Sequence, residues 1–195
     1  VTTLSTSGGD VVTITGTNLG PVQTTNYVYW NYTNSGLVGL AGSTFQSTGC
    51  SVTTANTIMT CTNVVGVGKS HKWKIRVGQQ DSSFSTSSTT YTSPAITTFT
   101  SSVTTLTTAG GESVTVTGTS FGPVKTTNYV YANYTNTGLV GLASSTLQAS
   151  SCSVTTAQTT VVCNSVVGVG FSHKWRVRVG QQDSLYSTTT TSYTY

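Results

Sequence analysis

The four cysteines carry the clearest chemistry in this sequence. They fall into two pairs of identical spacing, Cys50 with Cys61 and Cys152 with Cys163. Residues 50–53 and 58–61 read as two short strands around a turn, and a symmetric hairpin would place Cys50 opposite Cys61. Opposed strand residues have Cα atoms about 4.5–5.5 Å apart, which suits a disulfide. We therefore expect one disulfide within each pair, formed in an oxidising compartment.

The alternatives for the cysteines are a zinc site and free buried thiols. The spacing Cys-x10-Cys, without a nearby His or a further Cys, is a poor ligand set for zinc. We accordingly expect no metal and no cofactor.

Two Asn-x-Thr sequons occupy matching places, beginning at Asn31 and at Asn133. Such triplets accept N-linked glycans on the secretory route of eukaryotes. Tyr29 and Tyr131 lie two residues earlier, on the same face of a strand, where a ring can stack on the first sugar. We predict N-glycans at both Asn residues, the alternative being an unmodified strand Asn. The Ser/Thr runs 85–90 and 187–191 are weaker candidates for O-glycans.

Six of the eight cations lie in two short stretches with period-two alternation. One face of each stretch is cationic and the other carries His71 and Trp73, or His173 and Trp175. The cationic faces would suit an acidic polysaccharide or an acidic partner surface. We favour the alternative of a solvated face whose charges prevent the sheet from pairing with other chains. In this interpretation the Trp lies in the core and the His is structural. The cations are Lys72, Lys74, Arg76, Lys174, Arg176 and Arg178.

Catalytic groupings are weak in this sequence. His71 and Asp81 occur beside many Ser residues, but the nucleophile motif Gly-x-Ser-x-Gly is absent. The first half carries only Asp10 and Asp81 as acids and the second only Glu112 and Asp183, too few for a glycosidase pair or a calcium site. We expect a protein that is not an enzyme.

An internal repeat organises the whole sequence. Gly8-Gly9, both cysteines and the His71-Lys72-Trp73 triplet all recur 102 residues later without a gap, and roughly two thirds of the aligned positions are identical. We expect two modules, residues 1–93 and 94–195. The stretch 94–102 has no counterpart before Val1, so the first module is expected to lack its opening strand and the sequence to belong to a longer array.

Composition limits the protein class. The chain has 195 residues, among them 44 Thr and 27 Ser, and only 6% are charged. Heptad-forming residues are too few for a coiled coil, the apolar runs are too short for a membrane-spanning helix, and β-branched residues are too many for a disordered tail. A net charge of +4 without a dense basic stripe speaks against nucleic-acid binding.

Short alternating segments predict an all-β fold. They lie at 12–15, 27–32, 50–53, 58–61, 71–77 and 84–91, are separated by turn residues, and recur in the second half without an amphipathic helix. Six or seven such strands in about 100 residues are typical of an immunoglobulin-like sandwich. We predict two tandem immunoglobulin-like β-sandwiches.

The segment Gly8–Gly20 resembles the start of IPT/TIG domains, the immunoglobulin-like fold shared by plexins and certain transcription factors. Gly110–Gly122 repeats the pattern, with Phe121 where that family often has Phe. The Cys pair, Gly66-Val67-Gly68, Gly78-Gln79-Gln80 and a closing Tyr before Pro94 are also similar to the family. Intracellular members bind DNA through loops, whereas tandem, Thr-rich, Cys-paired copies are similar to extracellular surface and adhesion repeats of protists.

The resemblance and the sequons together imply a glycosylated extracellular or cell-surface array with a structural or adhesive role. Its expected partners are further copies of the module or chain, as in a filament, together with covalent glycans. One alternative is a carbohydrate-binding module that uses Tyr27, Tyr29 and Trp30; another is a DNA-binding domain, which the cysteine pairs and sequons disfavour. Because Trp30 becomes Ala132 in the second copy, we expect Trp30 at a surface or at a contact between modules.

Overall fold

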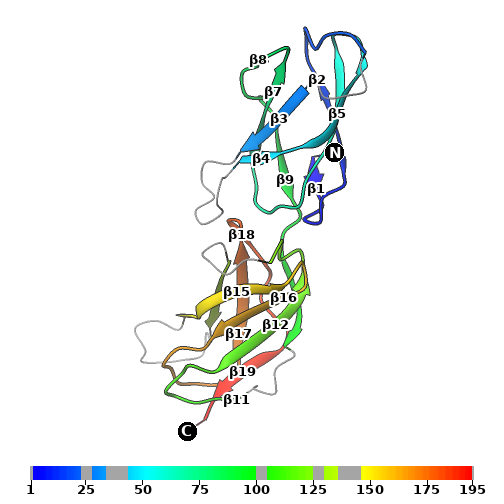
Figure 1. Ribbon diagram of the computed structural model, residues 1–195. Coiled ribbons are helices and arrows are strands. Elements are labelled where there is room, and N and C mark those ends of the chain that lie inside the picture. Colours follow the sequence, from blue (N-terminus) through cyan, green and yellow to red (C-terminus); the bar gives the residue numbers. More distant parts are fainter. Residues whose placement is uncertain are drawn as a thin grey trace. The chain divides into compact units, whose positions relative to one another are not determined.

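The chain forms two compact units, Val1–Thr92 and Ser93–Tyr195, so the boundary lies one residue before the position expected from the repeat. The computed structural model describes residues 2–22, 28–33, 44–99, 105–124, 130–135 and 146–194, and of residues 28–33, 44, 130 and 131 only the backbone. Every regular element in these ranges is a β-strand (Figure 1). The described residues include no helix with the length and apolarity needed to cross a membrane.

Unit 2 consists of two sheets in its described ranges. The first has the order β10-β12-β16-β15 and is antiparallel throughout. The second has the order β11-β19-β17-β13-β14, in which β11 joins β19 in parallel and β18 pairs with β17. The strands are β10 (Ala95–Phe99), β11 (Thr105–Leu106), β12 (Ser113–Thr119), β13 (Val130–Thr135), β14 (Thr146–Gln148), β15 (Ser150–Thr156), β16 (Thr160–Asn164), β17 (His173–Val179), β18 (Gln182–Asp183) and β19 (Thr190–Tyr193).

Unit 1 repeats this arrangement with one difference. Its sheets have the orders β2-β6-β5 and β1-β9-β7-β3-β4, and β8 pairs with β7. Among the described residues of unit 1, no strand corresponds to β10, so β2 lies at the edge of its sheet. The strands are β1 (Thr3–Leu4), β2 (Val11–Thr15), β3 (Val28–Thr33), β4 (Thr44–Gln46), β5 (Thr48–Thr54), β6 (Ile58–Thr62), β7 (His71–Val77), β8 (Gln80–Asp81) and β9 (Ser88–Tyr91).

Each unit is therefore an immunoglobulin-like β-sandwich, and the all-β class predicted from the sequence is confirmed. The core lies between the two sheets and is built from alternate strand residues, while the intervening Thr side chains face outward. Buried side chains in unit 1 include Leu4, Val12, Leu19, Val52, Met59, Trp73 and Tyr91. Their counterparts in unit 2 are Leu106, Val114, Phe121, Val154, Val161, Trp175 and Tyr193.

A disulfide joins β5 to β6 in unit 1 and β15 to β16 in unit 2. Cys50 is bonded to Cys61 and Cys152 to Cys163, with Cα–Cα distances of 4.1 and 4.0 Å. Val52 pairs with Met59, which is the hairpin register expected from the sequence. The disulfides follow from this local register, because it brings each cysteine opposite its partner.

Glycine is required where the loop 64–68 passes the closing tyrosine. A Cβ atom on Gly66 would lie 2.6 Å from the hydroxyl oxygen of Tyr91, and one on Gly168 would lie 2.7 Å from that of Tyr193. These hydroxyls donate to the carbonyls of Val64 and Val166, at 2.7 and 2.6 Å. The glycine of the Gly66-Val67-Gly68 motif thus makes room for a tyrosine that fastens the loop to β9.

Candidate functional site

The outward face of β7 or β17 lies beside the sequon strand in each unit. In the strand register, Asn31 pairs with Lys74 and Asn133 pairs with Arg176. Directly paired residues project from the same face of a sheet. Asn133 and Arg176 are both partly exposed, so this face is accessible at the second sequon. The side chains of Tyr27, Tyr29, Trp30, Asn31 and Tyr131 lie outside the described residues.

The alternation expected in the cationic strands is present. His71, Trp73, His173 and Trp175 are buried, whereas Lys72, Lys74 and Arg76 and their counterparts in β17 are partly or fully exposed. A two-residue turn after β7 then brings an acid back onto the cationic face: Arg76 pairs with Asp81 in the register of β7 and β8.

Each cationic face carries its own counter-ion. Asp81 accepts hydrogen bonds from Arg76 Nε at 2.5 Å and from Lys74 Nζ at 2.9 Å. Asp183 binds Arg178 through both carboxylate oxygens, at 2.7 and 2.8 Å. The Arg76 hydrogen bond, followed by that of Lys74, lowers the pKa of Asp81, and Asp81 in turn raises the pKa of Arg76. The faces are therefore less positive than the count of cations alone implies.

Asp81 and Asp183 are site residues whose structural role the sequence reasoning missed, since it considered them only for catalysis. The signal was present: Arg76-Val77-Gly78-Gln79-Gln80-Asp81 is a cation and an acid separated by a tight turn. In the structure Gly78 and Gln79 both have positive φ, at 53° and 66°. This turn is short enough to pair the two ends of the motif.

Two exposed aromatic side chains at equivalent positions of the two units were also not considered as surface groups. Phe84 is 53% exposed, and Tyr186, at the equivalent position of unit 2, is 44% exposed. The guanidinium carbon of Arg176 lies 5.2 Å from the centre of the Tyr186 ring, a cation–π distance. The outward face of unit 2 therefore combines a sequon, a cation and an aromatic ring.

The histidines are structural, as their position on the Trp side suggests. His71 and His173 are fully buried and bind the carbonyls of Val67 and Val169 through Nε2, at 3.2 and 3.0 Å. Because a carbonyl only accepts, Nε2 must carry the proton in both rings. Desolvation lowers the pKa of His71 to about 4 and also lowers that of His173.

The residues considered for catalysis do not form a catalytic group. His71 is buried under the sheet, whereas Asp81 is exposed and paired with Arg76 on the outward face. Glu112 accepts hydrogen bonds from the hydroxyl of Ser165 and from the backbone N–H of Thr107, which lower its pKa to about 2. In the part of the chain that the structure describes, no three His, Cys, Asp or Glu side chains gather as metal ligands would.

Several hydroxyls in the predicted O-glycan runs are not accessible. Thr89 in the run 85–90, and Ser187 and Thr191 in the run 187–191, are buried. Thr89 and Thr191 accept hydrogen bonds from the indole N–H groups of Trp73 and Trp175. In the folded chain these three hydroxyls are buried and hydrogen-bonded to core tryptophans. Any O-glycans in the runs would therefore have to use the exposed positions, such as Thr86 and Thr188.

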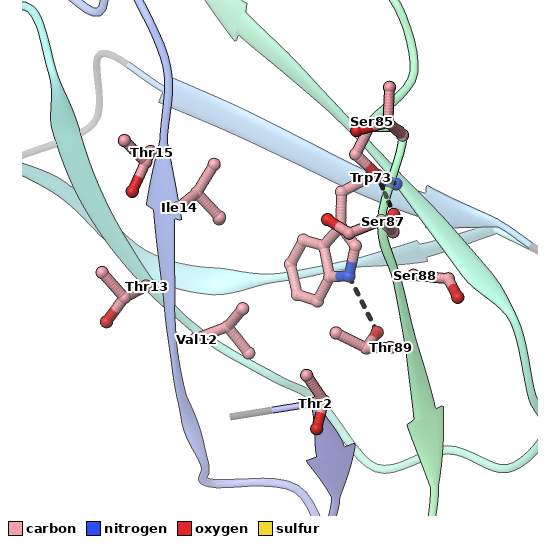
Figure 2. A pocket seen from close by; sticks show the side chains of 11 residues that line it. Thr2, Val12, Thr13, Ile14, Thr15, Trp73, Ser85, Ser87, Ser88 and Thr89 are labelled. Atoms are coloured by element: carbon pink, nitrogen blue, oxygen red, sulfur yellow. Dashed lines mark hydrogen bonds between the residues drawn. The ribbon is translucent and has the colours of Figure 1, made fainter.

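Unit 1 also has an open groove of about 390 Å³ along β2. Val12 and Ile14 line one side of it, residues 85–89 line the other, and the indole of Trp73 lies between them (Figure 2). The indole N–H points away from β2 and donates to Thr89. The groove thus presents an apolar floor beside the outer edge of a β-strand.

Comparison with known proteins finds no matching family model and no matching curated protein. Among solved structures, the chain is similar to the FN1–FN3 domains of chicken CNTN1, with 11% identity over 95% of this chain and 63% of that one and a TM-score of 0.31. The adhesin InvE of Yersinia pseudotuberculosis gives 12% identity, 93% and 54% coverage and a TM-score of 0.35. The D0–D1 domain of intimin is 14% identical over 99% of this chain and 95% of that one, with a TM-score of 0.26.

The chain thus spans less than two thirds of the first two of these structures. Likenesses with TM-scores this low identify neither a family nor a function for this chain.

Proposed function

We propose that this chain is a stretch of an extracellular, N-glycosylated array of IPT/TIG-like units with a structural or adhesive role at a cell surface or in a filament. The observation that carries the proposal is the duplication of one disulfide-bonded sandwich. Cys50–Cys61 and Cys152–Cys163 occupy the same place in two units that share about two thirds of their residues. Disulfides of this kind persist in oxidising compartments.

The outward faces support the glycosylated part of the proposal. Asn133 lies partly exposed on a sheet face beside Arg176, where a glycan has room to extend. Four of the six cations on these faces form ion pairs within their own unit, with Asp81 or with Asp183. Contact with a polyanion through the six cations of β7 and β17 is therefore secondary. The main partners are further copies of the unit and covalent glycans.

A repeated, self-contained unit suits a mechanical role. Each sandwich has its own core and its own disulfide, which stabilise it against unfolding. Polar, uncharged Thr side chains cover the strands without creating a strong field around the array.

Mass spectrometry of the secreted protein tests the proposal. The intact mass is measured before and after reduction and before and after enzymatic removal of N-glycans, for the parent, Asn31→Gln and Asn133→Gln chains. We expect two disulfides per chain and the loss of one glycan with each substitution. Thr135→Ser is the matched control, because it keeps the second sequon and should keep its glycan. Free thiols together with an unmodified mass from the native source would contradict the proposal.

A further inference from the structure

The two units differ at the outer edge of one strand. In unit 2, β10 lies against β12, with Phe99 paired to Val116 and Thr98 to Thr117. In unit 1, the equivalent strand β2 pairs with β6, and no described strand lies on its other side. Accordingly Thr13 and Thr15 are exposed, whereas Thr115 and Thr117 are partly buried. An open strand edge offers unpaired backbone donors and acceptors to an incoming strand.

Glycine at one position shows that unit 1 keeps room for such a strand. A Cβ atom on Gly118 would lie 2.0 Å from the carbonyl oxygen of Ala95 in β10, so only glycine fits there. Gly16 is the equivalent residue of unit 1, and its Cβ would meet nothing closer than the side chain of Leu19 at 3.4 Å. Neither glycine has a positive φ, so the backbone conformation at position 16 does not require glycine. The requirement at position 118 comes from the neighbouring strand β10, together with Phe121.

The groove of unit 1 lies where β10 packs in unit 2. Phe99 of β10 meets the ring of Trp175 edge to face, with centroids 5.9 Å apart. Trp175 is then fully buried, as is Val116 on β12. In unit 1 the equivalents Trp73 and Ile14 line the groove, and Ile14 is only partly buried. The groove therefore has the floor that receives an aromatic side chain in unit 2.

We propose that the groove between β2 and residues 85–89 is an acceptor site for an extended strand of the β10 type, which pairs antiparallel with Ile14–Gly16 and places an aromatic side chain on Trp73. The donor is an in-line linker strand that precedes β1 as β10 precedes β11. In unit 2, Phe99 lies six residues before Thr105, the first residue of β11. The donor aromatic is therefore expected six residues before Thr3. This site depends neither on glycans nor on the compartment, so it stands apart from the function proposed above.

The chemistry of β10 defines what the site accepts. The segment Ala95–Phe99 is uncharged and rich in β-branched residues. It begins with the small residue Ala95, whose carbonyl lies against Gly118, and it ends with the aromatic ring of Phe99. Such recognition combines main-chain hydrogen bonds for affinity with a side-chain pocket for specificity.

The test extends the chain ahead of Val1 by a copy of residues 93–102 and follows amide hydrogen exchange in both units. The Gly16 N–H already donates to the carbonyl of Thr57, so the Thr15 N–H between Ile14 and Gly16 faces the open edge. We expect exchange of the Thr15 amide to slow at least tenfold relative to the parent chain, with β12 unchanged. A control extension carries serine in place of the copied Phe99 and should protect this amide several-fold less. Exchange at the parent rate in the extended chain would overturn the proposal.

Two further measurements separate the donor in line from other sources. A synthetic peptide of residues 93–102 should protect β2 in the parent chain, and this protection should be lost in Gly16→Ala, in which the new methyl group meets the incoming backbone. The extended chain should no longer bind the peptide and should remain monomeric by light scattering. A dimer or polymer of the extended chain would overturn the in-line assignment, because the strand would then come from another copy.

Discussion

The indole nitrogen of Trp73 in β7 donates a hydrogen bond to the hydroxyl oxygen of Thr89 in β9, the neighbouring strand of the same sheet, at 2.8 Å. Trp175 and Thr191 repeat the bond in unit 2 at 2.9 Å. Both threonines are buried and belong to Ser/Thr runs that read as surface sequence. Thr therefore has two roles in this protein, as the outer covering of the strands and as the partner of the core tryptophan.

Replacing Thr89 by Val should destabilise unit 1 by about 1–3 kcal/mol, because the shape is kept while the buried indole N–H loses its acceptor. Chemical denaturation followed by Trp fluorescence measures the change. Thr86→Val in the same run is the control: Thr86 is exposed, and the cost there should stay within about 0.5 kcal/mol. Equal effects of the two substitutions would mean that the Trp73–Thr89 bond contributes nothing.

Replacing Gly118 by Ala should destabilise unit 2 by about 1–3 kcal/mol, because the methyl group would displace the carbonyl of Ala95 and the ring of Phe121. Gly16→Ala is the matched control in unit 1, where the methyl group has space, and it should be neutral or stabilise by about 0.4–1 kcal/mol. Thermal unfolding resolved by hydrogen-exchange mass spectrometry assigns each effect to its unit. A destabilised unit 1 in Gly16→Ala would contradict the difference in packing described here.

Removing one disulfide should weaken only the unit that contains it. The cysteines of each pair are 11 residues apart, for which loop-closure entropy predicts a loss of about 3 kcal/mol. The double substitution Cys152→Ala and Cys163→Ala should therefore lower the unfolding midpoint of unit 2. Exchange rates in unit 1 are the internal control, and a comparable fall there would show that the two units do not unfold independently.

Unit 1 should lose stability as the pH falls from 6.5 to 4. His71 has an ordinary pKa of 6.5 when unfolded and one of about 4 when folded, because burial disfavours its charged form. The unfolded chain then binds the proton first, so stability is complete above pH 6.5 and declines by about 3 kcal/mol on the way to pH 4. Denaturation midpoints measured across this range give the slope.

The variant His71→Phe should flatten this slope, since its ring fills the same aromatic surroundings without titrating. Phe45 and Tyr91 each lie 5.4 Å from the His71 ring, edge to face. Asp81 does not interfere in the upper part of the range, because its pKa is lowered below its ordinary value of 3.8. A slope that persists in His71→Phe between pH 6.5 and 5 would assign the effect to another group.

Prediction from sequence succeeded where structure is local. Val52 pairs with Met59 in the 50–61 hairpin, as the sequence predicted, and Cys50 lies beside Cys61, although the register shifts at Thr54, which pairs with Ile58. The alternation in 71–77 identifies Trp73 as a core residue, because a strand turns each second side chain to the same face. The strands of two or three residues, such as β1, β4 and β8, were not predicted, since segments this short show no period of their own.

Ala132 shows why substitution between copies is a weaker guide. It is fully buried in β13, although the change from Trp30 suggested a surface position. The side chain of Trp30 lies outside the described residues, so its own expected placement stays a prediction. Whether an inward position tolerates a change in side-chain size depends on how the residues that face it repack, and the sequence of one strand does not contain that information.

The sequence by itself determined the duplication, the two hairpin disulfides and the inward and outward faces of the strands, because each depends on residues near one another along the chain. Only the tertiary structure decided which hydroxyls of a uniform Ser/Thr run enter the core and which glycine a neighbouring strand requires. Thr86 and Thr89 are alike in sequence, and so are Gly16 and Gly118. What separates them is the strand that lies beside them in the same sheet: β7 lies beside β9 at Thr89, and β10 lies beside β12 at Gly118. That neighbour comes from elsewhere in the chain, so the residues around each position do not reveal it.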